Sequence, residues 1–279
     1  ATAERLASYG EAVKRIQEGR DLARRSGSNQ MGTQLLLNLA QVYYRQGALG
    51  PAWNTACEAL DEARELDDLR LVGQAHDQLG EIARIAGDAS EAQSLFELAA
   101  QAFEQVGDER KRATTRCNSR ILDLYTGSSA SSEEAVREVE TLANLQQEIS
   151  RWFWAELTLI EEKPDLVREW AKKIIHGAEN RHLSFLTNLA LLRASLLAGD
   201  EPMPSAEFLE QLEQLRVVEA PIAHAVVAAC SHGVERERHL AKAREILGEQ
   251  ALGLPRRMRE RHLDLLENYR GYLPEIELS

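Results

Sequence analysis

Apolar residues recur along the chain at the spacing of one helix face. The stretch "NLAQVYYRQGALGPAWNTACEAL" covers residues 38 to 60. In it and just before it, the apolar positions are Leu35, Leu36, Leu39, Val42 and Tyr43. Steps of three and four residues are typical of an amphipathic helix. A Gly break follows and a second helical stretch begins, so the pattern predicts a helical hairpin.

The same skeleton returns 40 residues later as "QLGEIARIAGDASEAQSLFELAA", residues 78 to 100. The matched pairs are Leu39 and Leu79, Ala40 and Gly80, Gly47 and Gly87, Ala52 and Ala92, and Ala59 and Ala99. The period extends back to Ala12 and forward to Gly127. Small residues at the matched positions let two helices approach closely. A repeat of this length predicts a solenoid built from stacked hairpins.

The order Leu, small residue, aromatic, Gly, Ala, aromatic or small residue, Ala resembles the tetratricopeptide repeat. The first unit carries it as Leu39, Ala40, Tyr43, Gly47, Ala52, Ala56 and Ala59. The second carries it as Leu79, Gly80, Ala83, Gly87, Ala92, Phe96 and Ala99. The resemblance covers about residues 10 to 127. It implies an all-α fold, a right-handed superhelix of stacked antiparallel helical hairpins, with units longer than the common length of about 34 residues. Such long units are similar to the arrays of some bacterial signalling ATPases, kinases and peptide-sensing regulators.

Beyond the second repeat the pattern diverges. Ser119 and Arg120 stand where the third repeat needs Leu and a small residue, and its second helix is expected to resume at Ser132. Pro, Gly and polar turns then divide the chain into helices expected at 148–162, 164–179, 181–198, 204–217, 220–232, 234–248 and 255–270. We expect one array over residues 1–279, with the better-matching repeats at 10–127 and divergent hairpins at 133–279. The alternative is two subdomains hinged near 127–132.

Composition narrows the class of protein. The formal net charge of −12 repels nucleic acid and anionic membranes. Three well-separated cysteines form neither a disulfide framework nor a metal motif, which fits a reducing cytoplasm. We find neither a signal peptide nor an apolar run long enough to span a bilayer. The chain begins in helix-like sequence without Met, from which we expect a segment of a longer protein.

The resemblance also implies a binding groove, because the first helix of each tetratricopeptide hairpin lines the concave side. Carried over by register, the groove residues are Gln34, Leu37, Gln41, Tyr44, Arg45, Gln74, Asp77, Glu81, Arg84 and Tyr125. Their polar, mixed-charge character fits a peptide. Solvated helix faces would show the same composition, so the groove is a hypothesis.

Two kinds of residue form candidate interaction patches outside the groove. Arg112, Arg116 and Arg120 recur every four residues, which places them on one helical face. Either they pair with nearby acids, or they hold an acidic or phosphorylated segment. The same two interpretations apply to Arg256, Arg257, Arg259 and Arg261. Trp152 and Trp154 lie in "RWFWAEL" and cannot both share a face with Phe153, so we expect packing between hairpins, with a recognition surface as the alternative.

Motifs for catalysis or metal binding are absent from the sequence. His224, His232 and His239 lie about two turns apart, too far along one helix to share an ion, and Gly233 interrupts the helix. The phosphate-loop, dinucleotide, nucleophile-elbow and zinc-protease patterns are missing. We therefore expect neither cofactor nor metal.

These features predict a noncatalytic scaffold that binds a protein or peptide. We expect it to be the sensor or adaptor segment of a larger bacterial signalling protein, and other domains of that protein are candidate partners. One alternative is an oligomerisation module whose arrays pair without a groove ligand. Another is an enzyme with an all-α site that the sequence does not reveal.

Overall fold

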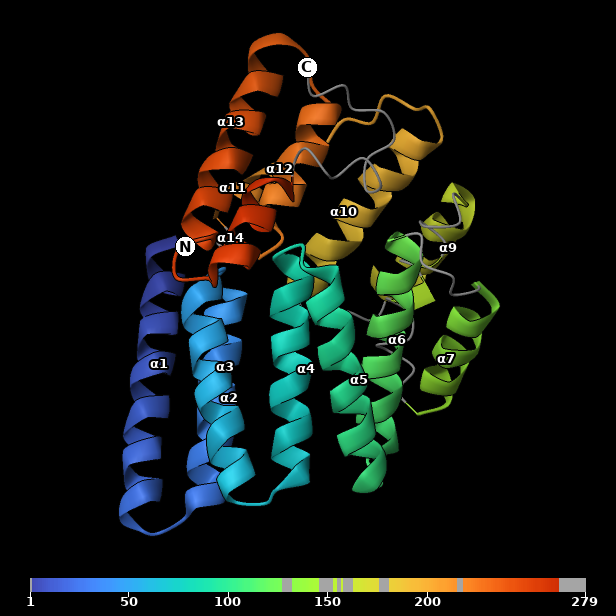
Figure 1. Ribbon diagram of the computed structural model, residues 1–279. Coiled ribbons are helices and arrows are strands. Elements are labelled where there is room, and N and C mark those ends of the chain that lie inside the picture. The colour runs from blue at the N-terminus through green and yellow to red at the C-terminus, as the bar shows by residue number, and fades with distance from the viewer. Residues whose placement is uncertain are drawn as a thin grey trace. The chain divides into compact units, whose positions relative to one another are not determined.

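A computed structural model describes residues 2–126, 132–145, 153–154, 157, 163–175, 181–214 and 218–265 of the protein. All regular secondary structure within these residues is helical, which confirms the all-α prediction (Figure 1). The chain forms two compact units. The first comprises residues 1–115, 214–218 and 247–263, and the second comprises 116–213, 219–246 and 264–279. Of the helices in the described part of the chain, none combines the length and the apolar character that crossing a bilayer requires.

Four consecutive helices of the first unit have the same length. The unit contains α1 (Thr2–Arg25), α2 (Asn29–Arg45), α3 (Leu49–Glu65), α4 (Leu69–Ile85), α5 (Ala89–Gln105) and the first part of α6 (Glu109–Tyr125). Helices α2 to α5 each have 17 residues, and α3, α4 and α5 each begin 20 residues after the start of the helix before. Neighbours in sequence pack side by side from α1 to α5 (Figure 1). One 40-residue period is therefore one hairpin of two equal helices, which confirms the tetratricopeptide-like architecture.

The turns of this unit repeat as strictly as the helices. A residue with positive φ stands at Gly27, Gly47, Asp67, Gly87 and Gly107, at intervals of 20. Each closes the helix before it in the left-handed conformation, which Gly adopts without steric cost. Asp67 does so at φ 52°, in the region that Asp tolerates better than most side chains. The turns therefore repeat every 20 residues, which is half of the 40-residue period of the sequence repeat.

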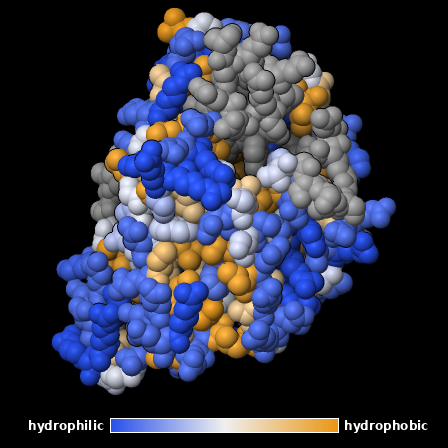
Figure 2. Space-filling model, in the orientation of Figure 1, coloured by the Kyte–Doolittle hydropathy of each residue, from blue (hydrophilic) through white to orange (hydrophobic). Residues whose placement is uncertain are grey.

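Small residues at the helix crossings set the packing distance, as the pattern predicted. Ala52 and Ala92 are fully buried, one in each hairpin. At Gly80 an added Cβ would lie 2.7 Å from the ring of buried Phe96, so only Gly leaves room for that ring. Between the polar bands on the face shown in Figure 2, apolar surface lies over α4 and the helices beside it.

The first unit also contains a segment from near the end of the chain. It consists of the last turn of α13 (Gly233–Gln250), a short loop and α14 (Arg256–Leu263). The loop lies against the start of α3, where an added Cβ on Gly50 would be only 2.2 Å from the Leu252 carbonyl oxygen. A segment about 200 residues away along the chain thus covers one end of the first hairpin.

The second unit is less regular. Besides the rest of α6 and most of α13, it contains α7 (Ser132–Leu145), α9 (Pro164–Ile175), α10 (Arg181–Leu197), α11 (Ala206–Gln214) and α12 (Ala220–Ala229). The start of α7 at Ser132 confirms the prediction for the third repeat. The helices expected from residue 164 to residue 248 are also confirmed as elements, with boundary differences of a few residues. The helix expected at 148–162 lies almost entirely outside the described residues.

Aromatic pairs hold parts of this second unit. Phe185 of α10 and Phe208 of α11 are both buried and stack with their ring centroids 5.1 Å apart. Trp154 stacks on Trp170 of α9 at 5.7 Å with nearly parallel planes. Stacked aromatic rings add to the free energy gained from their buried area. These aromatic pairs add to packing by small buried residues, such as Ala190 and Ala194 of α10 against Val167 of α9.

Candidate binding surface

Polar side chains of α2 and α4 form a row in the first unit, and several of them contact each other or α6. We call this row the polar face, and its members on α2 and α4 are Gln34, Gln41, Tyr44, Gln74, Asp77, Glu81 and Arg84. All seven are partly buried. At the start of the row, Gln34 Nε2 donates to Gln74 Oε1 at 3.3 Å, and these two residues are one period apart. Equivalent positions of two hairpins therefore meet, as expected if the first helices of the hairpins are neighbours.

Glu81 gathers the contacts at the other end of the row. Its Oε2 accepts from Arg84 at 2.8 Å and from the Tyr44 hydroxyl of α2 at 3.4 Å. Between the two ends, the side chain of Gln78 donates to the Leu37 carbonyl oxygen at 3.1 Å. Because these groups hold one another across two helices, their side chains are already ordered before a ligand arrives.

Asp77 connects the row to α6. Its carboxylate accepts from the Thr115 hydroxyl at 2.6 Å. Burial raises the pKa of the Asp77 carboxyl to about 6, although the hydrogen bond from Thr115 opposes the rise and the nearby charge of Glu81 adds to it. Lys111, also on α6, favours the ionised form of Asp77, while its own pKa is lowered by burial. The row thus contains a carboxyl group that titrates near neutral pH.

Three of the predicted groove residues have other surroundings. Leu37 is completely buried and contributes to the core of the first unit. Arg45 is exposed at the last position of α2. Tyr125 belongs to the second unit, where its hydroxyl accepts from Arg193 of α10 at 3.2 Å. Among the α2 and α4 members of the predicted set, side-chain contacts join Gln34 to Gln74 and join Tyr44 and Arg84 to Glu81.

Three arginines of α6, namely Arg112, Arg116 and Arg120, each pair with acids. Arg112 contacts Glu104 at 3.4 Å and also binds Glu109. Arg116 contacts Glu138 of α7 at 3.4 Å. Arg120 lies 3.3 Å from Asp123 and 3.7 Å from Glu134. This is the arrangement of a solvated face paired with acids, the first of the two interpretations of the arginine spacing.

The aromatic patch is described in part. Trp152 lies outside the described residues. Phe153 is buried, and Trp154 is partly buried in its stack with Trp170. Trp154 therefore takes part in packing within the second unit.

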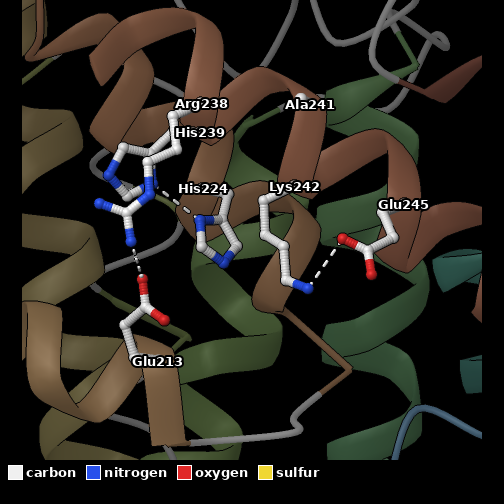
Figure 3. A pocket seen from close by; sticks show the side chains of 7 residues that line it. All are labelled: Glu213, His224, Arg238, His239, Ala241, Lys242 and Glu245. Carbon is white, nitrogen blue, oxygen red and sulfur yellow. Dashed lines mark hydrogen bonds and ion pairs between the residues drawn. The ribbon is translucent and has the colours of Figure 1, made fainter. Parts of the chain in front are cut away.

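A pair of histidines that the sequence did not bring together lines a pocket in the second unit (Figure 3). His224 of α12 and His239 of α13 are both buried, and their Nδ1 atoms lie 2.8 Å apart. One ring must donate there and the other accept, so the two imidazoles carry opposite tautomers. Burial lowers the pKa of His224 to about 4, with a further contribution from His239, and burial likewise lowers the pKa of His239. Burial therefore favours the neutral form of both rings.

The pocket around this pair has a volume of about 400 Å³. Its other side chains come from α11 and α13, and they are Glu213, Arg238, Ala241, Lys242 and Glu245. Arg238 binds Glu213 at 3.2 Å, and Lys242 binds Glu245 at 2.8 Å, so each cation has a carboxylate partner. Within the described residues, no group of three or more His, Cys, Asp or Glu side chains is arranged to hold a metal ion.

Comparisons with known proteins add little beyond the fold. No family model matches the chain, and a search of curated proteins also found no match. Among solved structures, the chain is similar to a tetratricopeptide repeat protein from Parabacteroides merdae, with 12% sequence identity and a TM-score of 0.46. That similarity covers 94% of this chain and 100% of the other. The helices and turns of the chain itself define its architecture.

Proposed function

We propose that the chain is a noncatalytic scaffold that binds a peptide or an extended segment of a protein on its polar face. The proposal is supported by the contacts that connect α2 to α4, above all those from Gln34 to Gln74 and from Tyr44 to Glu81. They order the side chains of two hairpins, so that a ligand meets groups whose entropy is already reduced.

The chemistry of the face defines the kind of ligand. Amide groups at Gln34, Gln41 and Gln74 can each donate and accept hydrogen bonds. Glu81 and Arg84 add one charge of each sign. This mixture suits the backbone and polar side chains of an extended peptide better than a strongly charged polymer. An overall charge of −12 further disfavours nucleic acid.

Within this function, we assign the chain the role of sensor or adaptor segment in a larger bacterial signalling protein. The support is the resemblance of its long repeat units to arrays of that kind. The role predicts that ligand binding changes the activity of an attached domain. Measuring that activity with and without the ligand, in the full-length protein, tests this assignment.

The binding proposal is tested by selecting peptides from a displayed random library against the whole chain. Selected peptides are then titrated against the wild type and against Tyr44→Ala/Arg84→Ala. We expect the double variant to weaken binding by about tenfold or more, the usual effect of removing an aromatic and an Arg from a binding site.

A matched control is Glu97→Ala/Gln101→Ala, which alters two exposed residues on α5. It should leave the affinity unchanged. If the selected peptides bind the Tyr44→Ala/Arg84→Ala protein as tightly as the wild type, the polar face is not their site. If selection yields no specific peptide, the scaffold proposal itself is contradicted.

A further inference from the structure

The α4–α5 turn of the first unit is bound by side chains of α14. The carboxylate of Asp88 is only 2% exposed, and Arg261 Nη1 lies 2.5 Å from its Oδ1. Arg257 lies 3.1 Å from Oδ2 and also donates to Ser90 Oγ at 2.9 Å. Both Asp88 and Ser90 stand at the start of α5. Two arginines thus converge on one carboxylate.

A third contact lies beside this ion pair. His262 Nδ1 is 3.1 Å from the Ile85 carbonyl oxygen at the end of α4. The last carbonyl groups of a helix have no acceptor role within the helix, so they need donors from elsewhere. The turn therefore presents a carboxylate, a hydroxyl and a helix-end carbonyl within reach of each other. We call Ile85, Asp88 and Ser90 the turn site.

The face of α14 that meets the turn site has a simple pattern. Arg257, Arg261 and His262 share it with Met258, and of these four Met258 and His262 are buried, at 4% and 1% exposed. These four side chains span an arc of about 140°, less than half of the helix circumference. The site therefore selects a helix with two arginines one turn apart, an apolar residue after the first arginine and a histidine after the second.

Several features make α14 a replaceable occupant. Asp88 also caps α5, accepting from Ser90 Oγ at 3.0 Å and from the Glu91 amide at 3.4 Å. When α14 leaves, Asp88 becomes an ordinary solvated N-cap, so no charge stays buried without compensation. The helix has only 8 residues and follows a loop in which Gly253 adopts φ 80°. The side chains of Arg257 and Arg261 are 61% and 40% exposed.

We propose that the turn site is a binding site for a short helix carrying an arginine pair, and that α14 is its resident occupant. A partner protein with such a helix competes with α14 for Asp88. This interaction is separate from the polar face and does not depend on the function proposed for it.

The test uses a labelled peptide with the sequence of residues 254–265, "LPRRMRERHLDL", and the whole chain. Three proteins are compared by fluorescence anisotropy: the wild type, Arg257→Ala/Arg261→Ala, and the same double variant with Asp88→Asn. In the double variant the resident helix loses both cations, so the peptide should bind. An occupant in place more than about nine-tenths of the time lowers the apparent affinity of the wild type by about tenfold or more.

Asp88→Asn keeps a good N-cap for α5 but removes the charge, so it should abolish peptide binding without unfolding the helix. A scrambled peptide of the same composition controls for attraction between a basic peptide and an acidic chain. Equal binding of both peptides, or binding that survives Asp88→Asn, would overturn the proposal. So would the absence of binding to Arg257→Ala/Arg261→Ala.

A second route opens the site without touching any ionic group. Gly50→Ala places a Cβ against the Leu252 carbonyl, which displaces the loop before α14, while Ala itself suits the start of α3. Its peptide affinity should rise toward that of Arg257→Ala/Arg261→Ala. Gly248→Ala in α13 is the matched control, because its Cβ would meet nothing within 4 Å. If Gly248→Ala raises the affinity as much as Gly50→Ala does, the loop does not control the site.

Discussion

The helices of the first unit and those of the second are packed by different means. From α2 to α5 every helix has 17 residues, and buried Ala and Gly positions repeat at the crossings. In the second unit the helices from α9 to α12 have 12, 17, 9 and 10 residues, and individual pairs such as Phe185 and Phe208 connect them. A helix interface that repeats along the chain can be predicted from sequence, because the same residue pattern recurs. An interface made by contacts that occur only once leaves no such pattern in the sequence.

The largest effect is expected from removing one packing contact in each unit. Phe96→Ala removes a fully buried ring that lies over Gly80, and Gly cannot fill the space. The free energy of unfolding should fall by about 3–5 kcal/mol. Phe208→Ala removes the matching ring of the Phe185 stack in the second unit. Hydrogen exchange followed by mass spectrometry should show the loss of protection in the first unit for Phe96→Ala and in the second for Phe208→Ala. If either variant lost hydrogen-exchange protection equally in both units, the division of the chain into two separately packed units would be contradicted.

The histidine pair should make the second unit sensitive to acid. Burial holds the folded-state pKa of His224 at about 4, below its ordinary value of 6.5, so the unfolded chain binds more protons between these values. The stability from the neutral pair is present above pH 6.5 and is lost as the pH falls toward 4, by up to about 3 kcal/mol. Facing groups of both signs, Glu213, Glu235, Arg238, Lys242 and Glu245, surround the pair.

His224→Leu/His239→Leu removes both rings together and leaves no single imidazole without its partner. Urea unfolding at several pH values should show a shallower loss of stability in this variant than in the wild type. Burial also lowers the pKa of His76 and His262 in the first unit to about 4. Those residues are present in both proteins and cancel in the difference. Identical pH profiles would show that the pair carries no proton linkage.

The crossing of α4 and α5 can be tested by coupling two substitutions. Gly80→Ala forces a Cβ to within 2.7 Å of the Phe96 ring and should cost about 1–2 kcal/mol, even after the gain in helix propensity. In a Phe96→Ala background the same Cβ meets open space, so only the propensity gain of up to about 1 kcal/mol remains. The sign of the effect should reverse between the two backgrounds. A thermal or urea double-mutant cycle measures this, and additive effects would rule out the contact.

The sequence predicts the first unit well because its information is local and repeated. Gly47 and Gly87 mark turns, Ala52 and Ala92 mark crossings, and each pair confirms the other. Ser132 marks the start of α7 by the same local capping chemistry. The register borrowed from the family was less informative for single side chains. It assigned Leu37 to a groove, although Leu37 is an apolar side chain that the fold buries completely.

The sequence could not reveal the contacts that join distant residues. By their spacing, His224 and His239 could lie on one helix, but Gly233 between them indicates a helix break. In the structure Gly233 adopts φ 56° at the start of α13, so the chain break before α13 is what brings the two rings into contact. For Arg257 and Arg261 the sequence offered two interpretations, pairing with nearby acids or holding an acidic or phosphorylated segment. Their partner Asp88 lies more than 160 residues away along the chain, and no local pattern connects them.

The smallest expected effect comes from Asp77 in the first unit. Its effect on stability changes with pH in the direction opposite to that of the histidine pair in the second unit. Burial raises the folded-state pKa of Asp77 to about 6, above its ordinary value of 3.8, so the folded chain binds more protons in that interval. Stability at this site therefore falls as the pH rises from about 4 to about 6, whereas the histidine pair loses stability as the pH falls.

Asp77→Asn stays neutral and keeps an oxygen that accepts from Thr115. It should raise the free energy of unfolding at pH 7 by about 1 kcal/mol and have little effect near pH 4. Urea unfolding at both pH values measures the difference, and Asp77→Glu, which keeps the charge, should show no such gain. A gain of equal size at pH 4 and pH 7 would mean that packing, not the buried charge of Asp77, limits the stability of the polar face.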